Sequence, residues 1–195
     1  LERLSNRLQE KGYHVLIFMA GKDRQSIDNV IEEILDYQVD GIIAASVSMS
    51  SGLSERCRSA RVPMVLFNRA QDEPDMSAVT SDNIEGGKKI AKYLIGSGHK
   101  KISYIAGWEG ASTQRDRETG FTSILNEAGI NLHSRRVGNF VIEESREATR
   151  SMFSDKPPDA VFVANDHMAL AVMDTLRYEL GLKIPDDVSI VGYDD

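Results

Sequence analysis

The sequence contains few of the residues that carry metal or thiol chemistry. Its 195 residues include one cysteine, Cys57, and four histidines. A single cysteine forms no internal disulfide, which agrees with a reducing, cytoplasmic compartment. The histidines and the cysteine lack the spacing of a zinc site. Flanking arginines can make a thiol reactive, but we expect Cys57 to be an ordinary helix residue, half-buried or at the surface.

Long hydrophobic runs, a signal peptide and enzyme motifs are absent as well. No apolar stretch approaches the length of a transmembrane helix, so we expect no membrane contact. Residues 96–98 (GSG) end a helical pattern instead of opening one, and the sequence has no phosphate loop and no nucleophile elbow. The net charge, 23 − 30 = −7, disfavours binding of nucleic-acid phosphates by this segment itself. We therefore expect no enzyme activity, no catalytic residue, no metal and no cofactor.

Apolar stretches of strand length alternate with helical patterns along the whole chain. Because the strands are apolar almost throughout, we expect parallel sheets covered on both faces by helices, an α/β architecture. The periodicity predicts helices at residues 1–11, 25–37, 53–60, 84–95, 113–128, 143–153 and 168–180. It predicts strands at residues 14–20, 41–45, 63–67, 78–80, 102–106, 136–140, 160–164 and 188–192.

A break near residues 79–82 divides the pattern into two βα-repeating halves. We expect two lobes, residues 1–80 and residues 81–195, with a cleft between them. The first residues are already helical and uncapped, and the last residues directly follow an apolar strand. We therefore expect both ends to be cut from a longer protein.

Polar and aromatic groups follow every predicted strand, where ligands bind to open parallel sheets. Amides, carboxylates and aromatic rings suit neutral, polyhydroxylated or heteroaromatic ligands. The groups are Gly21-Lys22-Asp23, Ser46-Val47-Ser48, Asn68-Arg69, Ser81-Asp82-Asn83, Gly107-Trp108-Glu109, Asn139-Phe140, Asn165-Asp166-His167 and Tyr193-Asp194-Asp195.

The helix that begins in STQRDRETGF (112–121) aims two polar side chains inward. Steps of four residues back along its apolar stripe, from Phe121, reach Arg117 and then Thr113. A buried cation is costly unless it meets a partner, so we expect Arg117 to contact a ligand, with a structural ion pair as the alternative. Glu118 lies off the stripe and is expected to be solvated. Gly120 lowers helix propensity, which indicates close packing beneath it.

Several of these side chains have simpler alternative roles. Asp166 either caps the helix that follows or contacts the ligand, and Asn165, just before it, is expected to make a contact. Asp82 with Glu85 has the spacing of a capping box, and Asp82 is also a candidate for the cleft. Phe140 is either a core residue or a stacking ring.

The motifs GHKKISYIAG (98–107), STQRDRETGF (112–121), DAVFVANDHMAL (159–170) and GLKIPDDVSIVGYDD (181–195) resemble, in order and spacing, the effector-binding core of LacI/GalR-type transcriptional regulators. The resemblance covers nearly all of the chain. It implies a two-lobed, periplasmic-binding-protein-like fold with the effector between the lobes. It also implies a homodimer that reads operator DNA through a helix-turn-helix headpiece. That headpiece, the first strand of the first lobe and a carboxy-terminal return segment are expected to lie outside this chain.

The resemblance also implies roles for individual residues. The effector arginine of the family falls on Arg117, with Thr113 one turn earlier, and the stacking aromatic falls on Phe140. The remaining matches are the asparagine and aspartate after a strand, Asn165 and Asp166, and the carboxylate after the last strand, Asp194. Where the family often has Asp-Arg, this chain has Asn68-Arg69, which removes one carboxylate.

The identity of the effector stays open at the level of sequence. A pentose, a hexose, a sugar phosphate and a nucleobase such as a purine all remain candidates. Arg117 near a helix N-terminus tolerates an anion, whereas the many carboxylates disfavour one. A periplasmic sugar receptor of a transporter is the alternative function, because its fold and its cleft would be the same.

Overall fold

The computed structural model describes residues 2–19, 21, 24–47, 51–71, 76–154 and 156–194, and its chain forms two compact units. Unit 1 comprises residues 1–67 and 72–77, and unit 2 comprises residues 68–71 and 78–195. This division lies close to the expected boundary at residue 80, except that segment 68–71 belongs to unit 2. The assignment of residues 1–80 and 81–195 as two lobes with an effector cleft stays a prediction. Lys22, Asp23, Ser48 and Asp195, expected at strand ends, lie outside the described residues.

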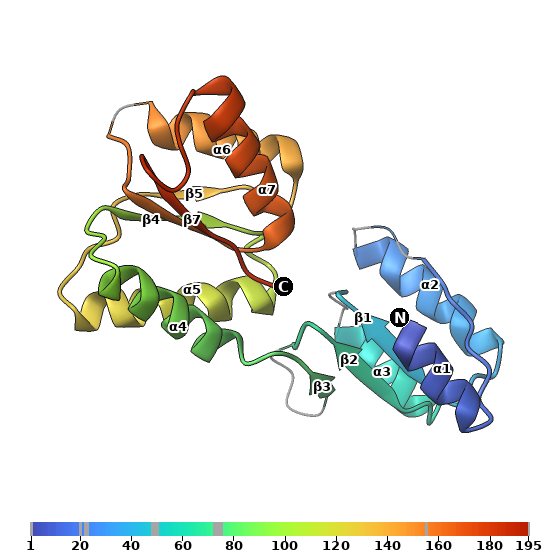
Figure 1. The fold of residues 1–195 in the computed structure, drawn as a ribbon. Coiled ribbons are helices and arrows are strands. Elements are labelled where there is room, and N and C mark those ends of the chain that lie inside the picture. The colour runs from blue at the N-terminus through green and yellow to red at the C-terminus, as the bar shows by residue number, and fades with distance from the viewer. Residues whose placement is uncertain are drawn as a thin grey trace. The chain divides into compact units, whose positions relative to one another are not determined.

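Unit 1 builds a small core between two helices and a parallel strand pair (Figure 1). Ile27 and Ile31 of α2 pack with Leu66 of β2 in this core. Ile43 and Phe67 point away and are 43% and 50% exposed, so the described residues cover one face of this sheet only partly. The elements of unit 1 are α1 (Glu2–Glu10), α2 (Arg24–Asp36), β1 (Ile42–Ala45), α3 (Ser51–Ser59) and β2 (Met64–Phe67). The sheet has the order β1-β2-β3, and of β3 (Ser77–Val79) the first residue belongs to unit 1 and the other two to unit 2.

Cys57 lies inside this core and not at the surface or half-buried as the sequence suggested. Only 3% of the residue is exposed, because α3 turns it toward the strands. Burial raises the pKa of the thiol, and the charge of Arg56 opposes that effect without cancelling it. The thiol is therefore less reactive than an exposed one.

The strand predicted at residues 14–20 is wrong for the described residues 14–19; Ala20 lies outside them. Leu16, Ile17 and Met19 are 58%, 63% and 87% exposed. An apolar run forms a strand only where a neighbouring strand supplies backbone hydrogen bonds. Among the described residues, β1 lies in a sheet with β2 and β3, and none of these strands pairs with this run.

Unit 2 is a four-stranded parallel sheet covered on both faces, as the sequence predicts. The strands β4 (Ile102–Ala106), β5 (Arg135–Val137), β6 (Ala160–Val163) and β7 (Ser189–Val191) lie in the order β5-β4-β6-β7. Every residue of β4 and of β6 is buried. Because β5 and β6 lie on opposite sides of β4, the winding direction reverses beside β4, and ligands bind at the carboxyl ends near such a switch point.

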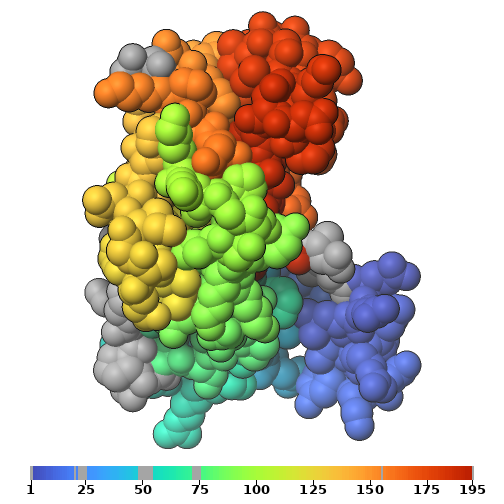
Figure 2. Space-filling view, turned by 60° about the vertical axis from the view of Figure 1, so that its left-hand side comes forward, coloured from blue at the N-terminus to red at the C-terminus, as the bar shows by residue number. Residues whose placement is uncertain are grey.

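The helices of unit 2 form two layers (Figure 1). Helices α4 (Asn83–Gly96) and α5 (Ser112–Glu127) cover one face. On the other face lie α6 (Ile142–Phe153), α7 (Asp166–Asp174) and the π-helical turn η1 (Thr175–Glu179), which continues α7. Figure 2 shows this second layer as adjoining orange and red surfaces. Between the layers, the fully buried rings of Tyr104, Phe121 and Phe162 lie with centroids 4.9–5.8 Å apart.

Two glycines allow α4 and α5 to approach closely. A Cβ atom at Gly120 would lie 1.9 Å from the carbonyl oxygen of Ile84, and one at Gly87 would lie 2.1 Å from the carbonyl oxygen of Arg117. The close packing expected beneath Gly120 is therefore confirmed. Because Gly87 lies against the backbone of Arg117, the contact between the two helices also fixes the position of the Arg117 backbone.

Candidate functional site

A pocket of about 200 Å³ lies at the carboxyl ends of the strands of unit 2. It gathers six of the eight site residues predicted from the sequence, and Asp82 and Asp166 are the two that do not line it. A larger depression, of about 400 Å³, lies at the far ends of α4 and α5, where Lys92 and Glu127 line it and none of the site residues predicted from the sequence does. The small pocket is therefore the candidate site. Its lining residues are Asn68, Arg69, Thr113, Arg117, Phe140, Asn165 and Asp194.

Arg117 is the centre of this site. It is only 5% exposed, although it carries a charge. Its Nε donates to Oδ1 of Asn83 (2.9 Å), its Nη1 donates to the carbonyl oxygen of Ala164 (2.6 Å) and its Nη2 donates to Oδ1 of Asp194 (3.2 Å). The guanidinium also lies over the ring of Tyr193, 3.8 Å from the centroid. Helix α5, the start of α4 and the ends of β6 and β7 thus meet at one cation, which offsets the cost of burying it.

Asp194 supplies the carboxylate of this cluster and stays accessible from the pocket. Its side chain is 51% exposed. Burial raises the pKa of its carboxyl group, the charge of Arg117 opposes that rise, and the charge of Asp166 adds to it. Arg117 therefore forms the structural ion pair that the sequence left open, and it lines the pocket as well.

The helix caps are distributed differently from the expected pattern. Asn165, not Asp166, is the N-cap of α7, because the Asn165 backbone is extended and its Oδ1 accepts from the backbone N–H of Met168 (3.0 Å). Asn165 nevertheless lines the pocket as well. Asp166 lies in the first turn of the helix, where its backbone N–H donates to the carbonyl oxygen of Tyr193. Asp82 caps α4 by accepting from the backbone N–H of Glu85 (2.9 Å), which is the capping alternative.

Three of the lining residues have a backbone conformation that favours glycine. The φ angles of Asn68, Phe140 and Asp194 are 72°, 59° and 143°. The ring of Phe140 also lies so close to the end of β4 that a Cβ atom at Gly107 would meet it at 2.1 Å. Strained conformations of this kind persist where the surrounding structure enforces them, and they cluster at binding sites.

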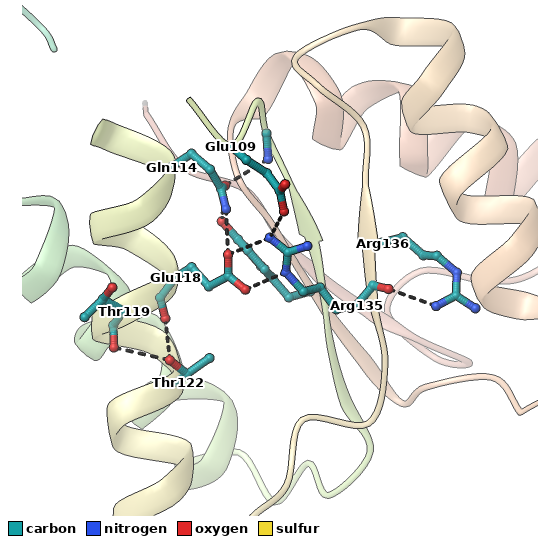
Figure 3. Close-up of polar contacts among 9 residues, drawn as sticks. Glu109, Gln114, Glu118, Thr119, Thr122, Arg135 and Arg136 are labelled. Carbon is teal, nitrogen blue, oxygen red and sulfur yellow. Dashed lines mark hydrogen bonds and ion pairs between the residues drawn. The ribbon is translucent and has the colours of Figure 1, made fainter. Parts of the chain in front are cut away.

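A polar network behind the pocket holds the N-terminal half of α5 (Figure 3). Gln114 is 1% exposed and accepts at Oε1 from the hydroxyl of Tyr104 (2.6 Å) and from the backbone N–H of Gly107 (2.9 Å). Its amide nitrogen donates to Glu118 (2.7 Å). Burial, and then the charge of Glu118, raise the pKa of Tyr104, which keeps its hydroxyl protonated as a donor. The network therefore joins the end of β4 to the helix that carries Thr113.

Glu118 is not solvated as expected, because it forms an ion pair with the following strand. Only 23% of its side chain is exposed. Arg135 of β5 donates to its two oxygens at 2.6 and 2.9 Å and also pairs with Glu109 at 2.8 Å (Figure 3). These contacts, the hydrogen bond to Glu118 first, raise the pKa of Arg135, so it stays charged. They tie β5, which leads to Phe140, to α5.

The model of periplasmic binding proteins and the sugar-binding domain of the LacI family matches residues 1–195. The chain belongs to this family. The HTH-type transcriptional repressor PurR of Pasteurella multocida is 32% identical over 189 residues, which are 95% of this chain and 56% of that protein. The probable HTH-type transcriptional repressor ExuR of Bacillus subtilis is 32% identical over 168 residues, 84% of this chain and 50% of that protein. The transcriptional regulator CelR in complex with cellobiose has a TM-score of 0.88 at 30% identity, with 98% of this chain and 60% of that chain covered.

Membership of the LacI and periplasmic-binding-protein family confirms the resemblance drawn from the four motifs and the α/β fold with two parallel sheets. The chain spans about half of the length of these relatives. The roles assigned to individual lining residues rest on the geometry and stay predictions.

Two residues that support this LacI-family site were not among the site residues predicted from the sequence. Asn83 is 3% exposed and accepts from Arg117, but it follows the capping residue directly and gives no periodic signal. Gln114 could have been found from the periodicity of the helix. It lies seven residues, or about two turns, before Phe121 and therefore on the same helix face. Within the described parts of the chain, no cluster of histidine, cysteine or carboxylate side chains is arranged to hold a metal ion. Nor does any helix described there have the length and apolar character to span a membrane.

Proposed function

We propose that the chain is the effector-binding core of a LacI-type transcriptional regulator and that the pocket of unit 2 binds a small effector. Arg117 is the observation that carries this proposal. It is a buried cation in the lining of a pocket, and it joins the ends of two strands and the start of a helix. The repressors among the relatives support a regulator.

The lining residues differ in the chemical groups of the effector that they can bind. Arg117 and Asp194 offer a donor and an acceptor to polar groups of the effector, and Phe140 stacks on its ring. The small polar groups of Asn68, Thr113 and Asn165 add hydrogen bonds. Asp82 and Asp166 act from outside the lining, Asp82 by capping α4 and Asp166 by its charge on Asp194.

The effector acts by shifting the populations of two conformations of a cytoplasmic homodimer that binds operator DNA through a headpiece. The effector can shift the free-energy difference between the two conformations by no more than the difference between its binding free energies to them. Nothing in this mechanism needs a catalytic step. The names of the relatives favour a regulator over a periplasmic receptor of a transporter. The upstream sequence separates these two functions, because a regulator has a helix-turn-helix there and a receptor has a secretory signal.

The proposal is tested by replacing Arg117 and measuring effector affinity. A thermal-shift screen of sugars and purines on the full-length protein first finds a ligand, because a ligand at a hundred times its dissociation constant stabilises by about 2.7 kcal/mol. Calorimetry then compares wild type with Arg117→Ala, for which we expect roughly a tenfold or greater loss of affinity. Thr113→Val, which keeps the size of the side chain, covers the case in which the arginine variant unfolds. Arg115→Ala changes an exposed arginine on the same helix and serves as the control.

Unchanged affinity in both lining variants would contradict the site. Operator DNA binding, measured by fluorescence anisotropy with and without the ligand, tests the regulator separately. A ligand that binds in the pocket but leaves DNA affinity unchanged would argue against regulation.

A further inference from the structure

The pocket contains two arginines whose surroundings differ. Arg117 has a protein acceptor for each nitrogen of its guanidinium, on Asn83, Ala164 and Asp194. Arg69 also lines the pocket, but its guanidinium forms no hydrogen bond with the described residues, and its Nε is buried without a partner. A buried donor without an acceptor costs about 1–3 kcal/mol, so the Nε of Arg69 is a donor in this pocket for which the described residues supply no acceptor.

The position of Arg69 is nevertheless well defined. The segment that carries it belongs to unit 2, and the backbone N–H of Ala70 donates to Oγ of Ser112 at the start of α5 (3.0 Å). The guanidinium lies between two rings, 5.6 Å from the centroid of Trp108 and 5.9 Å from that of Phe140. Cation–π contacts at these distances attract the guanidinium toward the two rings and use none of its N–H groups. The arrangement therefore holds a partly buried guanidinium, with its Nε fully buried, in the lining of the pocket.

The charge of the lining is positive. Two arginines and one carboxylate line the pocket, and Asp82 and Asp166, which counted against an anion in the sequence, lie outside the lining. Asp194 is already paired with Arg117. Burial lowers the pKa of Arg69. Thr113, at the start of α5, adds the positive end of a helix dipole to the same side.

We propose that the effector is a sugar that carries an anionic group, a carboxylate or a phosphate, and that Arg69 binds that group. This inference rests on the proposed function and extends it, since it names the class of effector and assigns a specificity residue. A planar guanidinium pairs with two oxygens of a carboxylate or phosphate at once, which a neutral hydroxyl does not match. Trp108 and Phe140 then serve as walls that orient Arg69 and exclude water from the ion pair.

The experiment compares matched neutral and anionic sugars on the full-length protein. The probes are glucose, glucuronate and glucose 6-phosphate, and galactose, galacturonate and galactose 6-phosphate, each measured by calorimetry. The proteins are wild type, Arg69→Gln and Arg69→Lys, with Arg177→Gln as a control that removes an equal charge from an exposed position of η1, outside the lining. Circular dichroism melts of each variant show that it is folded.

We expect at least one acid or phosphate to bind wild type ten times or more tightly than its neutral parent. Arg69→Gln should remove that preference, Arg69→Lys should keep part of it, and Arg177→Gln should leave it intact. The uronates and the phosphates identify which anion the site takes. Preferential binding of neutral sugars, or an anionic preference that survives in Arg69→Gln, would overturn this inference and leave the proposed function standing. Absence of binding in both series would count against both.

Discussion

Replacing Gly120 by alanine tests whether the contact between α4 and α5 positions the site. Alanine is the better helix former by about 1 kcal/mol, so propensity alone predicts stabilisation. The new Cβ atom, however, would lie 1.9 Å from the carbonyl oxygen of Ile84 and 2.8 Å from its carbonyl carbon, and neither backbone atom can rotate away. Ordinary contact begins at 3.4 Å, so the helices must separate by about 3.4 − 1.9 = 1.5 Å.

Steric cost should therefore exceed the gain in helix propensity. Overpacking costs about 1–3 kcal/mol where side chains can adjust and more where they cannot. The separation also loosens the packing of Phe121, which follows Gly120 and is fully buried. We expect Gly120→Ala to lower the free energy of unfolding of unit 2 by about 2 kcal/mol or more, and to weaken effector binding because Arg117 moves with α5.

The assay is urea unfolding followed by the fluorescence of Trp108, which is the single tryptophan of the sequence and lies in unit 2. The matched control is Gly96→Ala at the end of α4, where a Cβ atom meets nothing within 4 Å. That change should be neutral or stabilise by up to about 1 kcal/mol. If Gly120→Ala is as stable as wild type, or if Gly96→Ala destabilises equally, the contact does not constrain the helix pair and the reasoning is wrong.

Four further changes separate the roles of the acidic residues. Asp82→Ala should cost about 1 kcal/mol of stability through the lost cap and leave effector affinity unchanged in calorimetry, whereas an affinity loss would restore Asp82 to the site. Glu118→Gln should destabilise unit 2 by about 1 kcal/mol or more, since it weakens the partly buried pair with Arg135; Glu109→Gln, at a carboxylate 65% exposed, should change stability by less than about 0.5 kcal/mol. Burial raises the pKa of Asp194, so the folded state binds its proton more tightly than the unfolded state does. Relative to Asp194→Asn, wild-type stability should therefore fall slightly as pH rises from about 4 through the raised pKa; urea titrations at several pH values would show a flat difference if this is wrong.

Helical periodicity predicted the fold of unit 2 well, because its elements pack against one another. The apolar stripe on α5 correctly predicted that the side chains of Arg117 and Thr113 point inward, since the direction of each side chain follows from 3.6 residues per turn. The strand at residues 14–20 failed for the complementary reason. Its residues have the right character, but a strand depends on a partner that periodicity does not reveal.

The details of the site depended on backbone angles and on contacts distant in sequence. Asn165 and Asp166 both have an oxygen that can cap a helix, and only the extended backbone of Asn165 (φ −155°, ψ 167°) decides between them. Arg69 reaches the pocket because the next residue, Ala70, is anchored to Ser112, 42 residues further along the chain. No local pattern carries that information, so sequence reading named Arg69 without assigning it a role.

Backbone strain locates binding surfaces independently of any motif. Among the described residues, Gln38 and Arg61 have positive φ and follow helices, where a left-handed residue is an ordinary way to end a helix. The other non-glycine residues with positive φ follow strands instead: Ser46, Asn68, Asn139, Phe140 and Asp194. Each such conformation costs about 1–3 kcal/mol and persists only where surrounding contacts enforce it. Three of the five line the pocket around Arg117, so strain and buried charge, which arise from different forces, converge on one surface of unit 2.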